Sequence, residues 1–120
     1  MLTVNLELER DQAAPARARA MVRGLRPLFG AERTEDATLL VSELVTNAVK
    51  YGSGPVSLRV EADDERGRFT ISDAGGGATP ALRETGGTNA GGYGLHIVDR
   101  IADDWGVVHA SMHVWFDLTY

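Results

Sequence analysis

The stretch LLVSELVTNAVKYG, residues 39–52, determines how the rest of the chain is interpreted. Apolar residues recur in it, and just before it, at intervals of three to four, which is typical of a helix with one buried face. These apolar positions are Ala37, Leu40, Val41, Leu44, Val45 and Ala48. We expect the helix to begin at Thr34, a good N-cap residue that precedes two acidic residues, and to end at Gly52.

Two polar side chains lie at the edge of this apolar face. Glu43 and Asn47 are four residues apart, so they stand one above the other on the helix. A carboxylate beside an apolar surface is costly unless it has a partner. The pair is compatible with an ordinary solvated helix edge or with a site that uses both side chains.

A second motif follows an alternating, strand-like segment. The residues DAGGG, 73–77, give the spacing D-x-G-x-G. If the alternation continues, Asp73 points to the same face as Phe69 and Ile71, which is the face toward the core. A carboxylate there needs a hydrogen-bond donor. An Asx-turn at the end of the strand is the alternative explanation of an aspartate followed by glycines.

A third motif is glycine-rich. The residues GGYGLHIV, 91–98, place glycines ahead of an amphipathic helix that we expect from Tyr93 onward. The free N–H groups and the dipole at a helix start attract phosphate. Gly91, Gly92 and Gly94 are therefore candidate phosphate contacts.

The three motifs occur in this order within one small domain, and together they are more specific than any one of them. The chain resembles the GHKL ATP-binding fold (the Bergerat fold), and in particular the compact anti-sigma-factor serine/threonine kinases of bacteria. This resemblance covers nearly the whole chain. It implies ATP and Mg²⁺ as cofactors, Glu43 as the catalytic base, Asn47 as the Mg²⁺ ligand and Asp73 as the acceptor for the exocyclic amine of adenine.

The resemblance also implies which residues bind the nucleotide. They are Asn47, Lys50, Asp73, Gly75, Gly77, Gly91, Gly92, Tyr93, Gly94 and Leu95. For Lys50 a solvated side chain is the favoured interpretation from the sequence, and a phosphate contact is the alternative. The chain departs from the family in having Gly76 where a proline is common, and in having Ser111-Met112-His113 where Gly-Lys-Thr or Gly-Thr is common.

The remaining segments complete an α/β two-layer sandwich (α+β). Strand, two helices, two strands, a glycine-rich loop, a helix and two strands follow one another, which predicts three helices on one face of a mixed, largely antiparallel sheet. The first helix should be capped by Asp11 and either end early or kink at Pro27. The third should carry Asp103 and Asp104 in its last turn, against the sense of the helix dipole.

Length and composition indicate one ordinary globular domain, residues 1–120. No apolar run is long enough to span a membrane and there is no cysteine, so we expect a cytoplasmic protein without a membrane partner. The formal net charge of −5 argues against binding nucleic acid directly. A cluster of basic residues is either a solvated helix face or a contact surface for an acidic partner. The cluster consists of Arg17, Arg19, Arg23 and Arg26.

Two functions follow from the resemblance. The first is an anti-sigma factor that is also a serine/threonine protein kinase, with a sigma factor and an anti-sigma-factor antagonist as partners and a homodimer as a possible state. The second is a nucleotide-dependent partner-binding switch with little or no kinase activity. The catalytic domain of a sensor histidine kinase ranks last, because the chain has no room for a helix pair bearing a phosphoacceptor histidine.

Overall fold

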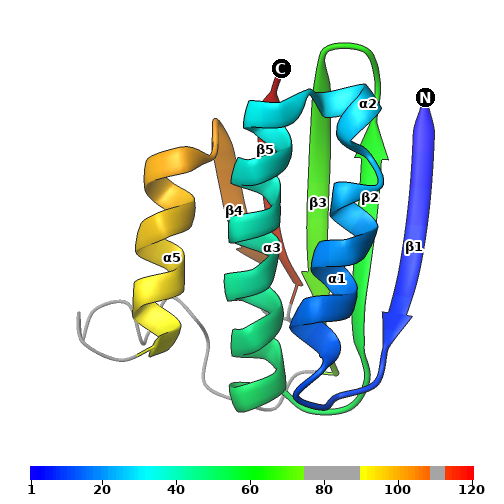
Figure 1. Cartoon of the computed structure of the whole chain (residues 1–120). Coiled ribbons are helices and arrows are strands. Elements are labelled where there is room, and N and C mark those ends of the chain that lie inside the picture. Colours follow the sequence, from blue (N-terminus) through cyan, green and yellow to red (C-terminus); the bar gives the residue numbers. More distant parts are fainter. Residues whose placement is uncertain (75–89, 109–112) are drawn as a thin grey trace.

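One five-stranded sheet carries the helices on a single face (Figure 1). The computed structural model describes residues 1–74, 90–108 and 113–120, the side chains of residues 90–94 excepted. The strands lie in the order β1-β2-β3-β5-β4. They are β1 (Leu2–Leu8), β2 (Val56–Ala62), β3 (Arg66–Ser72), β4 (Asp104–Val108) and β5 (His113–Thr119).

The two-layer sandwich and the largely antiparallel sheet are confirmed. Every strand pair within the described residues is antiparallel, so over these residues the sheet is not mixed. The helices are α1 (Ala14–Arg23), the short α2 (Arg26–Phe29), α3 (Ala31–Tyr51) and α5 (Ala90–Ile101). Helix α3 lies between α1 and α5 and packs against both, as the view in Figure 1 shows.

The core lies between the sheet and the helices. Strands β2 and β3 bury alternate residues, as the sequence pattern predicts for strands with one covered face. In β5 the apolar residues Val114, Phe116 and Leu118 alternate in the same way, and Asp117 is buried as well. Phe69 and Phe116 stack at the centre of the core with ring centroids 4.9 Å apart. The apolar stripe of α3 closes the core from the helix side, because all six of its predicted apolar positions are buried.

Helix α3 begins earlier than expected. Gly30 has φ +82°, a backbone conformation that favours glycine, and the helix starts directly after it at Ala31. The N–H of Thr34 donates to the carbonyl of Gly30 at 3.0 Å, so Thr34 already lies within the hydrogen-bonded helix and is buried. The prediction that Thr34 caps this helix is therefore wrong, whereas its end at Gly52 is confirmed.

The first helix also differs from expectation at both ends. Ala13 occupies the cap position of α1, and Asp11 lies two residues ahead of it, accepting a hydrogen bond from the N–H of Ala13 at 2.9 Å. The helix ends at Gly24, and Pro27 falls in the first turn of the separate helix α2, where its missing N–H costs nothing.

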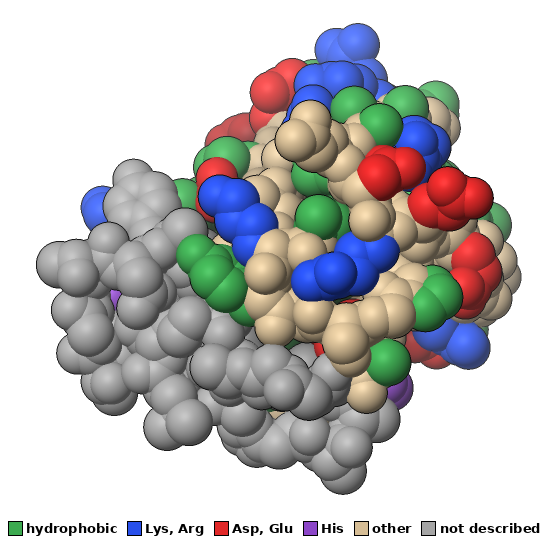
Figure 2. Space-filling view, turned by 90° about the horizontal axis from the view of Figure 1, so that it is seen from below, with side chains coloured by type: hydrophobic (Ala, Val, Ile, Leu, Met, Phe, Trp, Pro, Cys, Tyr) green, Lys and Arg blue, Asp and Glu red, His purple; other side chains and the backbone are tan. Residues whose placement is uncertain are grey.

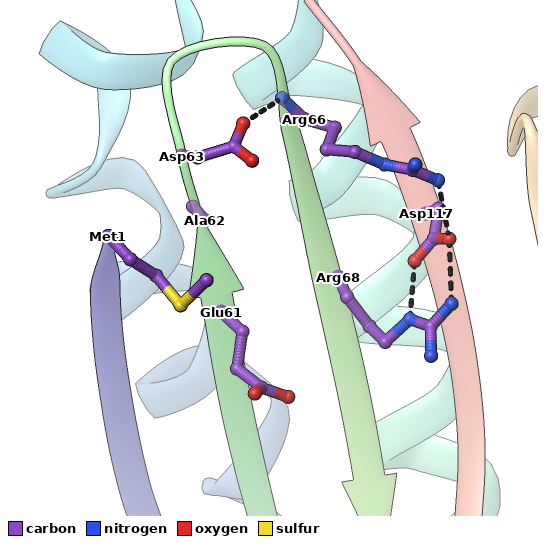
Figure 3. A pocket seen from close by; sticks show the side chains of 7 residues that line it. All are labelled: Met1, Glu61, Ala62, Asp63, Arg66, Arg68 and Asp117. Carbon is purple, nitrogen blue, oxygen red and sulfur yellow. Dashed lines mark hydrogen bonds and ion pairs between the residues drawn. The ribbon is translucent and has the colours of Figure 1, made fainter.

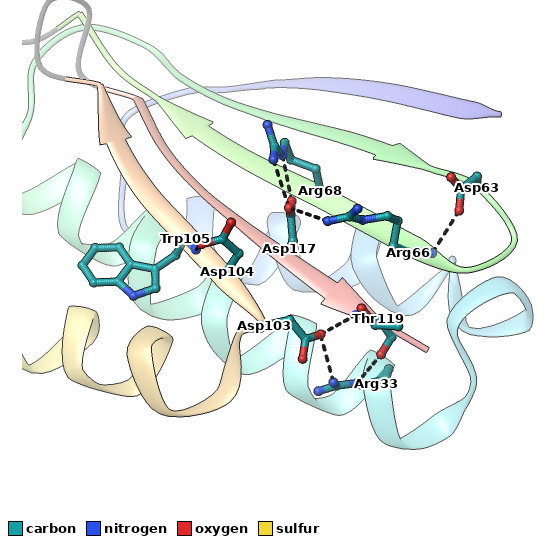
Figure 4. Close-up of polar contacts among 9 residues, drawn as sticks. All are labelled: Arg33, Asp63, Arg66, Arg68, Asp103, Asp104, Trp105, Asp117 and Thr119. Atoms are coloured by element: carbon teal, nitrogen blue, oxygen red, sulfur yellow. Dashed lines mark hydrogen bonds and ion pairs between the residues drawn. The ribbon is translucent and has the colours of Figure 1, made fainter.

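Asp103 and Asp104 do not belong to the last turn of α5, which ends at Ile101. Asp104 begins β4, and the carboxylate of Asp103 accepts hydrogen bonds from the N–H of Thr119 at 2.6 Å and from Arg33 at 3.2 Å (Figure 4). The expected conflict with the helix dipole therefore does not arise. The two aspartates instead join the end of α5 to the sheet and to α3.

Among the helices in the described part of the chain, none combines the length and the apolar character that crossing a membrane requires.

Candidate functional site

Three segments that carry the predicted motifs meet at one end of the molecule. Helix α3 and strand β3 end there and helix α5 begins there, at the lower end of Figure 1. Figure 2 views this end directly and shows basic side chains near the middle of the described surface, with acidic side chains gathered to one side of them. The sheet is antiparallel and α3 runs the length of the domain, so elements far apart in the sequence finish together.

Helix α3 places three predicted site residues on one side. Glu43, Asn47 and Lys50 follow one another at intervals of four and three residues, so their side chains share a face of the helix. Glu43 is half-buried, Asn47 is 6% exposed, and Lys50 is exposed in the last turn. A buried amide beside a half-buried carboxylate is not the arrangement of a fully solvated helix edge, which favours the interpretation of the pair as a site.

Asp73 follows directly after the end of β3 and lies on the helix side of the sheet. It is half-buried, and its carboxylate approaches the α-carbon of Gly52 so closely that a β-carbon on residue 52 would lie 2.4 Å from Oδ2. The next residue, Ala74, donates its N–H to the carbonyl of Ser53 at 2.8 Å. The residues that follow β3 are thus held against the residues that follow α3, and the carboxylate of Asp73 faces the end of that helix.

Sequence reasoning missed two residues at this end. Gly52 was interpreted only as a helix stop, and Arg10 was not singled out. Arg10, just after β1, donates from Nη2 to the carbonyl of Gly52 at 2.7 Å. The pattern held no signal for either contact, because both depend on how the ends of β1, α3 and β3 come together in space.

The glycine motif lies at the start of α5. The helix begins at Ala90, so Gly91, Gly92 and Gly94 fall in its first turns and do not precede it as expected. Tyr93 lies among them. Leu95 is completely buried in the core, so its part in a site would be to anchor the start of α5. The predicted nucleotide contacts Gly75 and Gly77, and the departures at Gly76, Ser111 and Met112, lie outside the described residues.

The donor set at this end fits an adenine nucleotide with its metal. Asn47 supplies a neutral amide oxygen, a suitable ligand for Mg²⁺ when phosphate oxygens and water complete the octahedron. Asp73 supplies an acceptor on the core side of the sheet, where the exocyclic amine of adenine could donate to it. The first turn of α5 supplies backbone N–H groups for phosphate. The described residues thus include an oxygen ligand, a hydrogen-bond acceptor and backbone donors of the kinds that such a ligand would use.

The predicted basic cluster is not one open patch. Arg17 forms an ion pair at 2.9 Å with an aspartate ahead of α1, and Arg19 donates to Oγ of Ser42 at 2.8 Å, which ties α1 to α3. Arg23 and Arg26 are exposed. Only part of the cluster therefore presents its charge to solvent without a described intramolecular partner.

A cavity on the helix-free face of the sheet is separate from this end of the molecule (Figure 3). It has a volume of about 290 Å³ and contains none of the predicted site residues. Asp117 is 2% exposed beneath it and accepts hydrogen bonds from Arg68 at 2.7 and 2.9 Å and from Arg66 at 3.1 Å. The hydrogen bond to Asp117 raises the pKa of the Arg68 guanidinium. These groups satisfy one another and join β3 to β5.

The sequence matches the family model of the histidine kinase-like ATPase domain over residues 6–117, and the chain belongs to this family. Its fold is similar to that in the crystal structure of the RsbU and RsbW domains of Rv1364c from Mycobacterium tuberculosis, with a TM-score of 0.71 at 19% sequence identity. That match covers 100% of this chain and 32% of the Mycobacterium tuberculosis chain, so this chain spans about a third of the length of that protein. No curated protein is similar enough to count as a match. The GHKL ATP-binding fold is thus confirmed, and family membership implies that ATP is bound.

Proposed function

We propose that the protein is an anti-sigma factor with serine/threonine kinase activity, which phosphorylates an anti-sigma-factor antagonist. The observation that carries the proposal is the grouping of Glu43 and Asn47 on α3 with Asp73 after β3, at the end of an ATPase domain where α5 begins. The RsbW domain named in the structural neighbour supports a regulatory protein of this kind.

Each residue has a defined role in this proposal. ATP, when bound, supplies the phosphoryl group, and Mg²⁺ neutralises part of its charge. Asn47 would hold the Mg²⁺, and Asp73 would accept a hydrogen bond from adenine and so fix the position of the adenine ring. Lys50 is exposed one turn beyond Asn47, and in this proposal it would contact phosphate oxygens on the solvent side. Gly75, Gly77, Gly91, Gly92 and Gly94, with Tyr93 and Leu95 beside them, belong to the binding segments.

Glu43 acts on the substrate and not on the nucleotide. Its carboxylate accepts the proton of the attacking serine or threonine hydroxyl, which a half-buried carboxylate one turn before the metal ligand is positioned to do. Most of the rate enhancement would come from positioning and from neutralising charge. A sigma factor is the second partner, which implies a cytoplasmic location.

The test is phosphoryl transfer from labelled ATP to a cognate antagonist. Glu43→Gln keeps the shape of the side chain and removes its basicity, so we expect transfer to fall by about a hundredfold or more while ATP binding is retained. Glu35→Gln, an exposed position on the same helix, is the matched control and should transfer at the wild-type rate.

Two outcomes would change the assignment. Wild-type transfer rates in Glu43→Gln would contradict its role as the base. If the wild-type protein binds ATP and a sigma factor but phosphorylates no cognate antagonist, the nucleotide-dependent switch becomes the better account.

A further inference from the structure

The turn that follows α3 is pressed against the residues that follow β3. Gly54 has φ +66°, and a β-carbon there would lie 2.9 Å from Cβ of Ala74. The backbone of the same turn accepts the hydrogen bond from Ala74 at the carbonyl of Ser53. Glycine at both ends of this three-residue turn allows an approach that larger residues would prevent.

Gly52 differs from Gly54 in what it makes room for. Its φ is −89°, which any residue adopts, so the backbone conformation does not require glycine. A β-carbon at residue 52 would instead lie 2.4 Å from Oδ2 and 2.6 Å from Cγ of Asp73, and 2.7 Å from the carbonyl oxygen of Ala48. The carboxylate of Asp73 therefore lies in the space that a side chain at residue 52 would occupy.

Arg10 also contacts Gly52. Its guanidinium donates to the carbonyl of Gly52 at 2.7 Å from a position 42 residues earlier in the chain. A charged donor on a helix-terminal carbonyl is a strong hydrogen bond for an exposed group. It fixes Gly52, and with it the surface against which the carboxylate of Asp73 rests.

We propose that Gly52, held by Arg10, is a positioning residue for Asp73 and determines the preference for adenine over guanine. The inference rests on the proposed function, in which Asp73 accepts the exocyclic amine of adenine. Guanine presents a carbonyl oxygen where adenine presents that amine, so a carboxylate held in place repels guanine and binds adenine. A displaced carboxylate loses this distinction.

The test compares the dissociation constants of ATP and GTP by calorimetry. Gly52→Ala should reduce the preference for ATP by about tenfold or more, with ATP binding weaker and GTP binding unchanged or tighter, because adenine loses its acceptor and guanine loses a repulsive contact. Gly54→Ala is the matched control in the same turn. It strains the backbone and meets Cβ of Ala74 at 2.9 Å instead of the carboxylate of Asp73, so it should lower the melting temperature and keep the preference. Equal losses of preference in both variants would overturn the proposal.

A double-mutant cycle separates the contact with Asp73 from the contact with Ala48. In an Asp73→Ala background the carboxylate is gone while the Ala48 carbonyl remains, so Gly52→Ala should cost no further ATP affinity. An undiminished loss in that background would show that Gly52 does not act through Asp73, and would overturn the proposal.

Arg10→Ala tests the proposal independently of whether Gly52→Ala folds. Arg10 is on the surface, and we expect a loss of ATP preference of about threefold or more, with Arg23→Ala as the control. An unchanged preference in Arg10→Ala would remove Arg10 and its hold on Gly52 from the proposal, and so overturn it. A wild-type protein that binds no ATP would instead contradict the proposed function, while the same cycle measured on melting temperature would still test whether Gly52 packs on Asp73.

Discussion

Asn47 is an amide that is almost completely buried on a helix, next to a half-buried carboxylate. A buried amide is costly in a helix interior unless its polar atoms are hydrogen-bonded or bind a ligand. As a metal ligand it would act on the nucleotide, whereas Glu43, one turn earlier, would act on the substrate. Replacing Asn47 should therefore impair nucleotide binding, whereas replacing Glu43 should impair phosphoryl transfer.

We expect Asn47→Ala to weaken ATP binding by about tenfold in the presence of Mg²⁺, and to have little effect when EDTA removes the metal. Titration calorimetry in the two buffers measures the difference. Because a buried polar group is lost, the melting temperature without nucleotide must be measured as a control. An equal loss of affinity with and without Mg²⁺ would show that Asn47 does not act through the metal.

Strands β3 and β5 are joined on the helix-free face by a carboxylate. The side chain of Asp117 is 3% exposed, yet the side chains of its arginine partners are 47% and 59% exposed, so solvent screens part of their attraction. We expect Asp117→Asn to lower the free energy of unfolding by about 1 kcal/mol, because the charge is lost while the shape remains. Urea unfolding measures it, with the exposed Asp64→Asn as the control. Equal stability of the two variants would mean that the ion pairs contribute nothing.

Tyr120, after β5, ties the end of the chain to the β2–β3 turn. Its hydroxyl shares its one proton between the carbonyls of Asp63 and Arg66, and its ring packs against Phe29 with centroids 4.8 Å apart. Burial raises the pKa of Tyr120, and the nearby charges of Asp63 and Asp64 raise it further.

The raised pKa gives Tyr120 a defined effect on stability. Since it is higher in the folded state, the contribution of Tyr120 is complete below pH about 10 and is lost as the pH rises through the folded value. The urea midpoint should therefore fall above pH about 10, and less so in Tyr120→Phe, which has no proton to lose. Lys50 is the single lysine of the chain, so tyrosines dominate this alkaline range. If the urea midpoint falls equally in the wild-type protein and in Tyr120→Phe, ionisation of Tyr120 does not contribute to the loss of stability.

Element types were predictable from the sequence because apolar periodicity reports burial directly. The stripe of α3 and the alternation in β2, β3 and β5 all correspond to buried faces. Element ends were less predictable, because tertiary contacts decide them. Thr34 has the chemistry of a cap, yet the turn at Gly30 starts the helix before it. Asp103 looked like the end of a helix, yet Arg33 and the N–H of Thr119 hold it outside.

In the candidate site, too, the sequence predicts some features, and others depend on tertiary contacts. Glu43, Asn47 and Asp73 could be identified from spacing and from their resemblance to a family, since these signals lie within short stretches. The contact between Gly52 and Asp73 could not, because it joins two segments through space and leaves no spacing in either. A glycine after a helix has an ordinary explanation as a stop, and only the fold reveals the second reason for it.

In the whole molecule, the helices cover one face of the sheet, and the motif-bearing segments converge at one end (Figure 1). Asp73 is tied to the end of α3, and α3 packs against α5. A ligand bound at this end would contact segments from the middle and the last third of the chain at once. Its binding energy would therefore be added to the stability of the whole fold and not to one element.

We expect ATP with Mg²⁺, at about 100 times its dissociation constant, to raise the free energy of unfolding by about 2.7 kcal/mol, since it binds the folded state alone. For a domain of this size that corresponds to a rise in melting temperature of about 10 °C. Differential scanning calorimetry measures it, with GTP and Mg²⁺ as the control for adenine and ATP with EDTA as the control for the metal. GTP should give a smaller rise because Asp73 would meet a carbonyl oxygen, and EDTA should reduce the rise because Asn47 would have no ion to hold. If saturating ATP with Mg²⁺ leaves the melting temperature unchanged and calorimetric titration shows no heat, the nucleotide site proposed at this end of the fold is wrong.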